Sequence, residues 1–426
     1  MPPTATGTRF SSLRAFGYPA YVRIWTGAFV SNVGTWVQAI SVGIYVTETT
    51  GKAGWTGTVA GLTYLPAVLL GPIGGALADR FERRSYIAPL TVVQALSSAG
   101  LALLSATGHL PLLAIAALVF LNGCASALSV PAFNALLSEL VEPKDLLSAV
   151  SLSSAQFNLA RIVGPMLAAA ILTYGSLTAA FVVNALSYLG VLLALASLAR
   201  STRPASGRAE TIRAGIARGL QVARTDPGIR VALPMVGVLA FLIAPFIGLM
   251  PAYAIKCLGR GAREASLMAV GQGVGALIAS GAANALAERL GVRGLLERTL
   301  IIVGPVAIAY WLSPTYAIAF GLLALLGAFY ILNINALSAT CMGRVSRDLQ
   351  ARISSLYSMT LSGGYAMGLA AQGWLSDRLG LRVVPAVAAG IVLAIALILR
   401  QRASLEAIDA PCEHGPAAVV EGAPAP

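Results

Sequence analysis

Apolar runs long enough to cross a lipid bilayer constrain this chain more than any other feature. A helix needs about 20 apolar residues to span ~30 Å of hydrocarbon. Runs of that length recur between clusters of charge, at residues 24–46, 55–78, 85–106, 110–132, 148–174, 176–199, 229–255, 264–287, 294–312, 315–340, 353–376 and 382–400. Charged residues make up only 11% of the chain, against about a quarter in soluble domains. The sequence therefore predicts an all-α membrane protein with twelve transmembrane helices.

The basic residues, which give a net charge of +12, lie mainly at the ends of these runs. With both termini cytoplasmic, 22 of the 29 Lys and Arg residues fall on the cytoplasmic side, six fall outside, and one, Arg161, falls within a run. Cytoplasmic loops of membrane proteins carry an excess of Lys and Arg. The pattern predicts a multi-pass protein of the cytoplasmic (inner) membrane with both termini inside. It predicts no nucleic-acid partner, because that would need a basic face in water.

The longest polar interruption, residues 200–230, divides the runs into six before and six after. We expect an N-terminal bundle over 1–199, a cytoplasmic linker over 200–230 and a C-terminal bundle over 231–400. Within the linker, Ile212, Ile216 and Leu220 recur at helical spacing, which predicts an amphipathic helix that lies on the anionic leaflet or is simply solvated. Residues 401–426 are rich in Pro, Ala and Glu and are predicted to be a disordered cytoplasmic tail.

An internal repeat supports two pseudo-symmetric halves. The segment GALADRFERR begins at Gly75, and NALAERLGVR begins at Asn284. Their acids, Asp79 and Glu288, are 288 − 79 = 209 residues apart, about half of the chain. Repeated bundles form the midplane site of many secondary transporters.

The first of these segments resembles the loop signature of major facilitator transporters. Its matching residues are Gly75, Asp79, Arg80, Arg83 and Arg84, with Glu288 and Arg289 as their counterparts. Gly75 would let two helix ends approach, and Asp79 could accept charge-assisted bonds that hold one conformation. The alternative is that the loop only anchors the chain through its positive charges.

Three further stretches resemble the branch that includes enterobactin and macrolide exporters, the transmembrane secretion effectors. They are SNVGTWVQ at 31–38, SAVSLSSAQFNLARIVGP at 148–165 and ARISSLYSMTLSGGYAMGLAAQGWLSDRLG at 351–380. Gly164 and Pro165 resemble the antiporter motif of the fifth helix, with alanines in place of its final glycines. In related transporters this motif implies export. Pro165 frees one backbone carbonyl and bends the helix, and its small neighbours permit close packing, which favours a hinge or tight seam, although a merely structural kink is the alternative. Asp377 and Arg378 repeat the loop pattern at the outer end of a helix, where they could hold an external gate or only cap the helix.

Arg161 is the candidate centre of the transport site, because a guanidinium within a membrane span is expensive unless it meets water, a partner or a ligand. Asn158 shares its helical face and Gln156 lies near. Three interpretations stay open: a site for an anionic substrate such as a siderophore, a gating or packing arginine bonded to carbonyls, and a wrongly placed span boundary.

Other polar side chains within spans could line the same cavity or pack helices together. They are Asn32, Thr35, Gln38, Asn122, Gln272, Asn333 and Tyr357. No Asp or Glu lies well inside a predicted span. Related exporters often carry an acid near the position of Thr35, so the residue that would carry a proton is not evident here.

The predicted function is secondary active export of a small amphipathic or anionic molecule, such as a siderophore or antibiotic, by alternating access. We expect a monomer, with a small-molecule substrate and the bilayer as partners, no cofactor or metal, and the proton gradient as energy source. Uptake by the same fold and a non-transporting membrane scaffold remain alternatives. An enzyme is not predicted, because no HExxH, no paired intramembrane acids and no phosphate-binding loop are present.

Overall fold

The computed structural model describes residues 11–78, 80–198 and 212–411, and these are almost entirely helical. The N-terminal half contains α1 (Pro19–Thr50), α2 (Ala53–Ala78), α3 (Arg83–Ala106), α4 (Leu112–Glu139), α5 (Leu146–Tyr174) and α6 (Leu177–Ala196). The linker helix is α7 (Ile212–Thr225). The C-terminal half contains α8 (Pro227–Leu242), α9 (Phe246–Lys256), α10 (Ala262–Trp311), α11 (Tyr316–Gly343), α12 (Arg347–Leu379) and α13 (Val383–Gln401). Short 3-10 helices, η1 (Ser11–Gly17), η2 (Pro143–Asp145) and η3 (Ser404–Ile408), complete the fold.

Two helices explain how these elements match the twelve predicted spans. Helices α8 and α9 form one passage, broken by a short turn at 243–245. Helix α10 holds two passages that meet at Gly291, whose φ of 71° is open to glycine but strained for other residues. Nine of the described passages are long and apolar enough to span a bilayer by composition. The all-α membrane fold is therefore confirmed, and the passages fit the predicted count of twelve.

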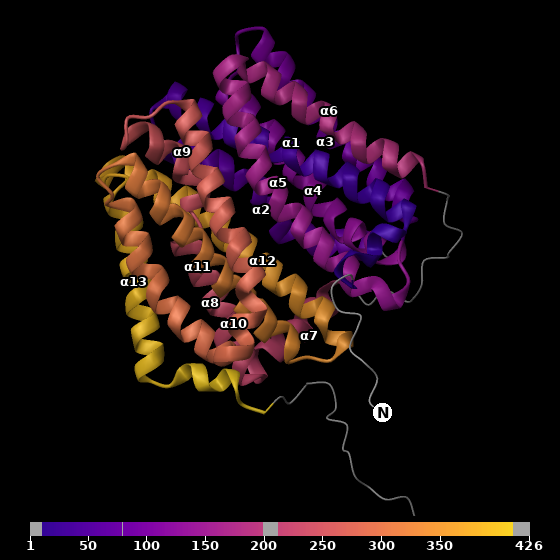
Figure 1. The fold of residues 1–426 in the computed structure, drawn as a ribbon, viewed down its shortest axis with the longest axis vertical. Helices are drawn as coiled ribbons and strands as arrows, with labels where there is room; N and C mark the ends of the chain where they lie inside the picture. Colours follow the sequence, from indigo (N-terminus) through magenta and orange to yellow (C-terminus); the bar gives the residue numbers. More distant parts are fainter. Residues whose placement is uncertain (1–10, 79, 199–211, 412–426) are drawn as a thin grey trace, which may run out of the picture.

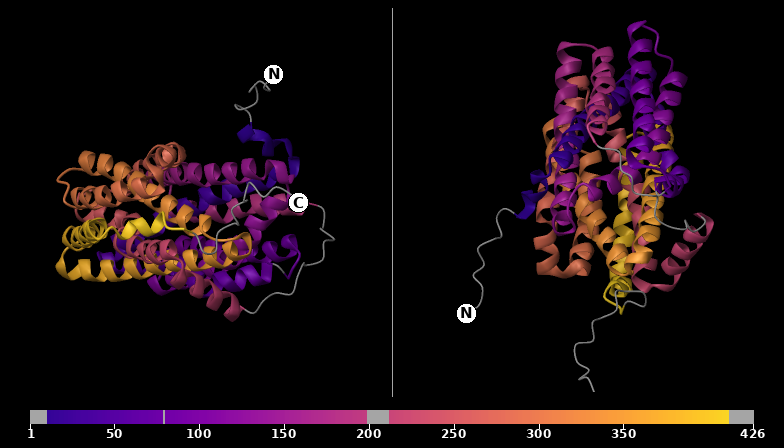
Figure 2. Two further views of the ribbon diagram at one scale, coloured as in Figure 1. Left: turned by 90° about the horizontal axis from the view of Figure 1, so that it is seen from below. Right: turned by 90° about the vertical axis from the view of Figure 1, so that its right-hand side faces the viewer.

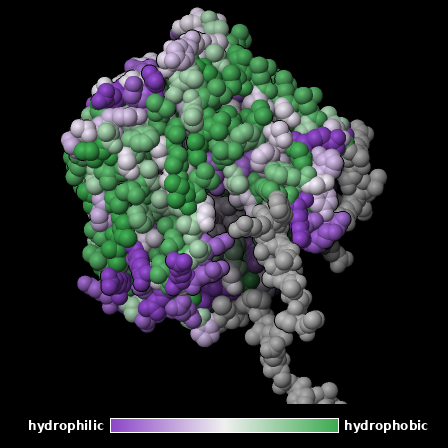
Figure 3. Space-filling model, viewed as in Figure 1, coloured by the Kyte–Doolittle hydropathy of each residue, from purple (hydrophilic) through white to green (hydrophobic). Residues whose placement is uncertain are grey.

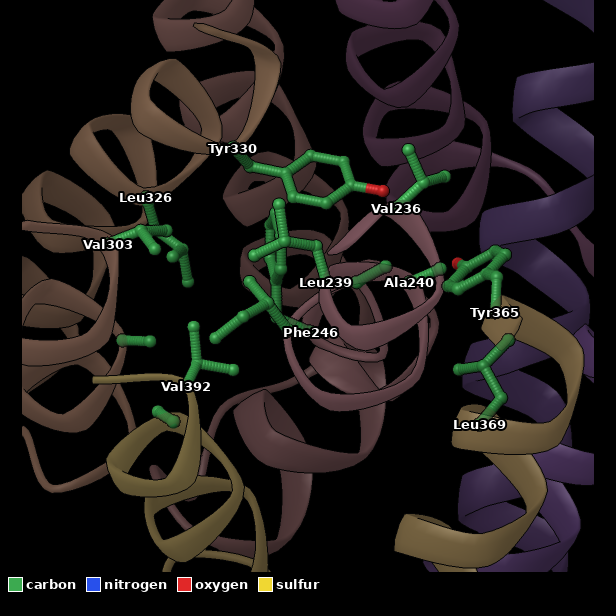
Figure 4. Close-up of a cluster of buried hydrophobic side chains, with 14 of the residues drawn as sticks. Val236, Leu239, Ala240, Phe246, Val303, Leu326, Tyr330, Tyr365, Leu369 and Val392 are labelled. Carbon is green, nitrogen blue, oxygen red and sulfur yellow. The ribbon is translucent and has the colours of Figure 1, made fainter. Parts of the chain in front are cut away.

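The passages form two bodies that touch along a few helix pairs (Figure 1). Helices α1–α6 make one body and α8–α13 the other, and the main contacts between them are α2 with α12 and α5 with α10. Within the C-terminal body, side chains of α8 and α9 pack against α10, α11 and α13, as Figure 4 shows for Leu239, Phe246 and Leu326. The halves thus meet mainly along two helix pairs, and Val37 and Ile40 of α1 join the hydrophobic core of the C-terminal body.

The helices run along one long direction of the molecule, which gives it two distinct ends (Figure 2). We call one the terminal end: α1 begins there, α6 and α13 finish there, and the α2–α3 and α4–α5 connections lie there. The other, the opposite end, carries the α1–α2, α3–α4 and α12–α13 connections, at residues 51–52, 107–111 and 380–382. Green apolar residues cross the middle of the face in Figure 3, and purple hydrophilic residues gather toward its ends, as expected for a protein surrounded by lipid.

The linker helix α7 packs on the C-terminal half, against α12 and α8. Its buried face carries Gly219, Val222 and Ala223, whereas Leu220 of the predicted apolar stripe is 40% exposed. A Cβ at Gly219 would lie 3.0 Å from the Leu356 side chain, so the glycine permits this close approach. The side chains of Ile212 and Ile216 lie outside the described residues.

The prediction of a disordered tail is wrong for its first eleven residues, 401–411. Helix α13 continues to Gln401, and η3 follows with Leu405 and Ile408 buried against the C-terminal half. The segment is held by partners distant in sequence, chiefly the Arg344 guanidinium, which composition could not reveal. Residues 412–426 lie outside the described part of the chain.

Candidate functional site

Two connected cavities lie between the halves. The first, about 720 Å³, is lined by α1, α2 and α4 on one side and by α9 and α12 on the other. The second, about 870 Å³, extends from the same residues of α1 and α4 along α5 to α10 and α11. Asn32, Thr35, Thr63, Asn122 and Phe157 line both. The two cavities therefore form one continuous space large enough for a drug-sized ligand.

This space extends toward the terminal end. Its lining there includes Gly75 near the end of α2, Ser138 near the end of α4 and Ala351 near the start of α12. At the opposite end α2 and α12 meet directly, since a Cβ at Gly57 would lie 2.2 Å from the Leu369 carbonyl oxygen. The structure is thus open toward the terminal end and sealed at the opposite end.

Arg161 lies in the middle of α5, is 6% exposed and lines the second cavity. Its guanidinium carbon stands 5.5 Å from the centre of the Trp36 ring, a cation–π contact. Its Nε has no hydrogen-bond partner, and the Arg161 side chain forms no ion pair or hydrogen bond with any of the described residues. The titratable groups that act on its charge are three tyrosines, Tyr64, Tyr330 and Tyr365. The site therefore holds one unbalanced positive charge.

Neighbouring amides add further donors to this positive centre. Asn32 donates from Nδ2 to Gln156 Oε1 at 3.3 Å, which leaves the buried Nε2 of Gln156 without a partner. Asn158 lines the second cavity and donates to the Ser154 carbonyl at 2.9 Å. In the cavity wall Tyr64 and Tyr365 meet across the two halves with ring centroids 4.8 Å apart. The arrangement combines unpaired hydrogen-bond donors with aromatic faces, which suits a ligand bearing acceptors and apolar rings.

The polar residues of α1 and α4 both line the cavity and hold helices together. Thr35 lies 3.4 Å from the Tyr188 hydroxyl, to which Asn122 donates at 3.3 Å. Gln38 accepts from Asn184 Nδ2 at 2.9 Å. Each of these three predicted residues lines the first cavity. Their hydrogen bonds tie α1, α4 and α6 into one body.

The predicted residues of the C-terminal half lie elsewhere. Asn333 is fully buried and bonded to Thr299 at 3.0 Å, and Tyr357 donates to the Ile334 carbonyl at 3.0 Å. Gln272 is buried, with its Nε2 unpaired. None of these three lines either cavity.

A serine stripe on α12, which we did not predict, faces the cavity instead. Ser354, Ser358 and Ser362 recur every four residues and line the first cavity, so they share one helical face. This four-residue spacing is visible in the sequence and could have indicated a polar helical face. Asn335 of α11 contributes to the second cavity.

Comparison with known proteins agrees with this architecture. A family model described as transmembrane secretion effector matches residues 10–422. The chain belongs to this family. This family is a branch of the major facilitator transporters, and its members are transporters, not enzymes.

Individual relatives of this secretion effector are distant but extend over most of its length. Macrolide efflux protein A of Streptococcus pyogenes is 23% identical over 396 residues, 89% of this chain and 94% of that protein. The enterobactin exporter EntS of Citrobacter koseri is 24% identical over 381 residues, 88% of each chain. Among solved structures, a bacterial homologue of the human lysosomal transporter Spinster, inward-facing and unoccupied, matches with a TM-score of 0.72 at 14% identity, over 92% of this chain and 97% of that one. The last similarity shows the fold.

In this secretion effector the loop residues of the terminal end pair within their own halves. Arg83 Nε lies 3.4 Å from Glu139 Oε1, and Arg84 donates to the Leu198 carbonyl. Around Gly75 an added Cβ would meet nothing within 4 Å. Asp79 lies outside the described residues, and the remaining predicted gating residues of this end, Arg80, Glu288 and Arg289, are exposed.

Gly164 and Pro165 lie at a tight seam between α1 and α5. A Cβ at Gly164 would stand 2.4 Å from the Trp36 Cβ and 2.9 Å from the Val33 carbonyl oxygen. Pro165 is buried beside it. The seam brings Trp36 against α5, and so places its ring beside Arg161.

Asp377 joins the two halves at the opposite end. Its carboxylate accepts from the backbone N–H groups of Ala53 and Gly54, both at 2.8 Å, and thereby caps the start of α2. Trp374 donates to Thr58 at 2.9 Å beside it. Arg378, its predicted companion, is exposed. The carboxylate thus contributes a polar contact to the closed seam.

Proposed function

We propose that this protein exports a small anionic or amphipathic molecule from the cytoplasm by alternating access, using the proton gradient. The observation that carries the proposal is Arg161, a buried cation without an ionised partner among the described residues, at the wall of a cavity open to one end. An anionic group on the substrate would balance this charge and form charge-assisted hydrogen bonds.

The orientation is part of the proposal. Positive-inside sorting favours placing the terminal end in the cytoplasm of a cytoplasmic-membrane protein. The open cavity would then load from inside, as an exporter requires, and the sealed end would face outward. The relatives are named for macrolide efflux and enterobactin export, which supports the same direction. We further propose that the protein works as a monomer without a bound cofactor.

The test compares three forms of the protein in a strain that lacks its own exporters: the wild type, Arg161→Ala and Arg161→Lys. Enterobactin and a macrolide are the probes, and export into the medium is measured at matched levels of membrane-inserted protein. Losing a hydrogen bond to a charged group costs about 1.5–3 kcal/mol, so Arg161→Ala should reduce export of a transported probe at least about tenfold. Arg161→Lys should retain part of it. Unchanged export by Arg161→Ala would exclude Arg161 from the site.

Uptake by the same fold is the competing function, and vesicles of opposite orientation separate the two. Inverted vesicles should accumulate the exported probe when energised, whereas right-side-out vesicles should not. Accumulation only in right-side-out vesicles would show an uptake permease.

A further inference from the structure

We propose that the membrane potential acts on the charge of Arg161 and biases the empty transporter toward the state that opens at the terminal end. The direction of the resulting transport rests on the proposed function, but the effect on the empty protein needs no substrate. Arg161 would then be the point at which the electrical part of the proton gradient acts on the protein.

A guanidinium stays protonated at any physiological pH, so Arg161 contributes one permanent positive charge. Within the described residues neither cavity is lined by an Asp or Glu side chain, and the cavity polar groups are neutral hydroxyls and amides such as Thr35, Asn122 and Ser358. The empty site is therefore cationic, and a bound monoanion makes it neutral.

The backbone of Arg161 packs on α10, where a Cβ at Gly273 would lie 3.0 Å from the Arg161 carbonyl oxygen. The residue thus sits on the α5–α10 contact between the halves. The cavity that reaches it extends along the first turns of α5 past Val150 and Ser154 toward the terminal end.

A potential drops across the part of a protein that excludes water, and little of it drops along a wet cavity. The cavity space reaches beyond Trp36, the ring partner of Arg161, to Gly43 and Thr56, so the dry part lies between that depth and the opposite end. In the alternate state the dry part would lie on the other side of Arg161. The guanidinium therefore crosses much of the field when the empty protein switches, although its own displacement is small.

The size of the effect follows from the charge. One elementary charge crossing 100 mV changes the free energy by about 2.3 kcal/mol, which is about a 50-fold change in the ratio of the two states. A cytoplasm-negative potential would return the empty, cationic protein to the state open inward. A protein loaded with a monoanion would switch without this bias. One cycle would carry one negative charge outward, the direction that the potential favours.

Cysteine labelling in inverted vesicles tests this inference without a substrate. Cys124, Cys257, Cys341 and Cys412 are replaced by Ser, and Ser358→Cys is added as a reporter in the first cavity. The probe is a membrane-impermeant maleimide on an uncharged polyethylene glycol chain, whose distribution does not depend on voltage. Valinomycin and potassium gradients set the potential of the terminal-end side from −100 to +100 mV.

We expect the labelling rate of Ser358→Cys to fall severalfold when the terminal-end side is made positive. Arg161→Lys should keep the voltage dependence and Arg161→Gln should lose it. As a matched control, Ser85→Cys, exposed at the terminal end and outside both cavities, should label at one rate at all potentials.

Two results would overturn the inference: a labelling rate of Ser358→Cys that does not depend on voltage, or the same dependence in Arg161→Gln. Neither result touches the proposed function, which the export assay tests separately. Conversely, export that is insensitive to Arg161→Ala together with voltage-dependent labelling would reject the substrate site and leave the voltage effect standing.

Discussion

The two ends of helix α2 meet the rest of the protein in opposite ways. Near its start, glycines face the C-terminal half at backbone distance: an added Cβ would lie 2.2 Å from a carbonyl oxygen at Gly57 and 2.9 Å from one at Gly61. Near its finish, a Cβ added at Gly71 or Gly75 would meet no neighbouring atom within 4 Å. Helix α2 therefore forms part of the closed seam near its start and part of the open cavity wall near its finish. The seam is made by small residues that let two backbones touch.

The charged residues follow the same division. At the opposite end the Asp377 carboxylate reaches across the seam to the N–H groups of α2. At the terminal end the described ion pairs stay within one half, such as Arg83 with Glu139 and Arg344 with Asp226. Opening the sealed end must break contacts between halves, whereas those terminal-end ion pairs can persist throughout. They hold each half rigid while the halves move.

The largest expected effect comes from breaking the terminal-end cluster around Arg344. Its Nε lies 2.6 Å from Asp226, which is fully buried, and its Nη1 donates to the carbonyls of Ile408 and Ala410 at 2.8 and 2.9 Å. Arg344→Met would leave Asp226 charged and uncompensated. Removing one partner of a buried pair costs about 3–5 kcal/mol. Thermal unfolding in detergent should show a large fall in stability.

A matched double variant separates the effect of the uncompensated Asp226 charge from the effect of losing the contacts of the Arg344 side chain. In Asp226→Asn with Arg344→Met no charge remains buried, and the amide oxygen can still cap α8 at the Ile229 N–H, as the carboxylate does at 2.9 Å. The double variant should recover part of the lost stability. Equal losses in the single and double variants would show that the carbonyl contacts to residues 408–411, and not the uncompensated charge, dominate.

The sequence predicted the fold well because hydrophobic length is a local property. Arg161 was also found locally, since a charge inside an apolar run is conspicuous. The partners of Asp377 and Arg344 were not predictable, because Ala53 lies 324 residues from Asp377 and Asp226 lies 118 residues from Arg344. The α12 serines were missed for another reason. A serine can satisfy its hydroxyl on its own helix, as Ser355 does on the Ala351 carbonyl at 2.9 Å, so its presence in a span gives no direction.

The next expected effect is smaller and concerns the closed seam between α2 and α12. Gly57→Ala places a Cβ against the Leu369 backbone, which has little freedom to move, so the sealed state should lose about 1–3 kcal/mol. Gly71→Ala is the matched control in the same helix: it meets open space and should leave the seal unchanged. Accessibility of a cysteine introduced at Gly43, which lines the sealed end of the first cavity, measures opening from the outside. Equal accessibility in the two variants would contradict the contrast between the ends of α2.

Removing the charge of Asp377 should weaken the seam less than Gly57→Ala can. Asp377→Asn keeps one acceptor oxygen but loses a charge-assisted bond and the interaction with the α2 dipole, together about 1–2 kcal/mol. The same cysteine should become more accessible from the opposite end. Arg378→Gln, which alters the exposed neighbour, should not change it. If both variants behave alike, the carboxylate does not hold the seam.

Substitution of Lys256 is expected to have the smallest effect on the seam. Its Nζ lies 3.5 Å from Asp377 Oδ1, but both residues belong to the C-terminal half, so this pair does not itself join the halves. Partly exposed pairs contribute about 0.2–1 kcal/mol and weaken with salt. Lys256→Gln should therefore change opening only slightly, and raising the salt concentration should abolish the difference from wild type. A change as large as that of Asp377→Asn would mean that Lys256 positions the carboxylate for its bonds to Ala53 and Gly54, and that the seam depends on an ion pair within one half.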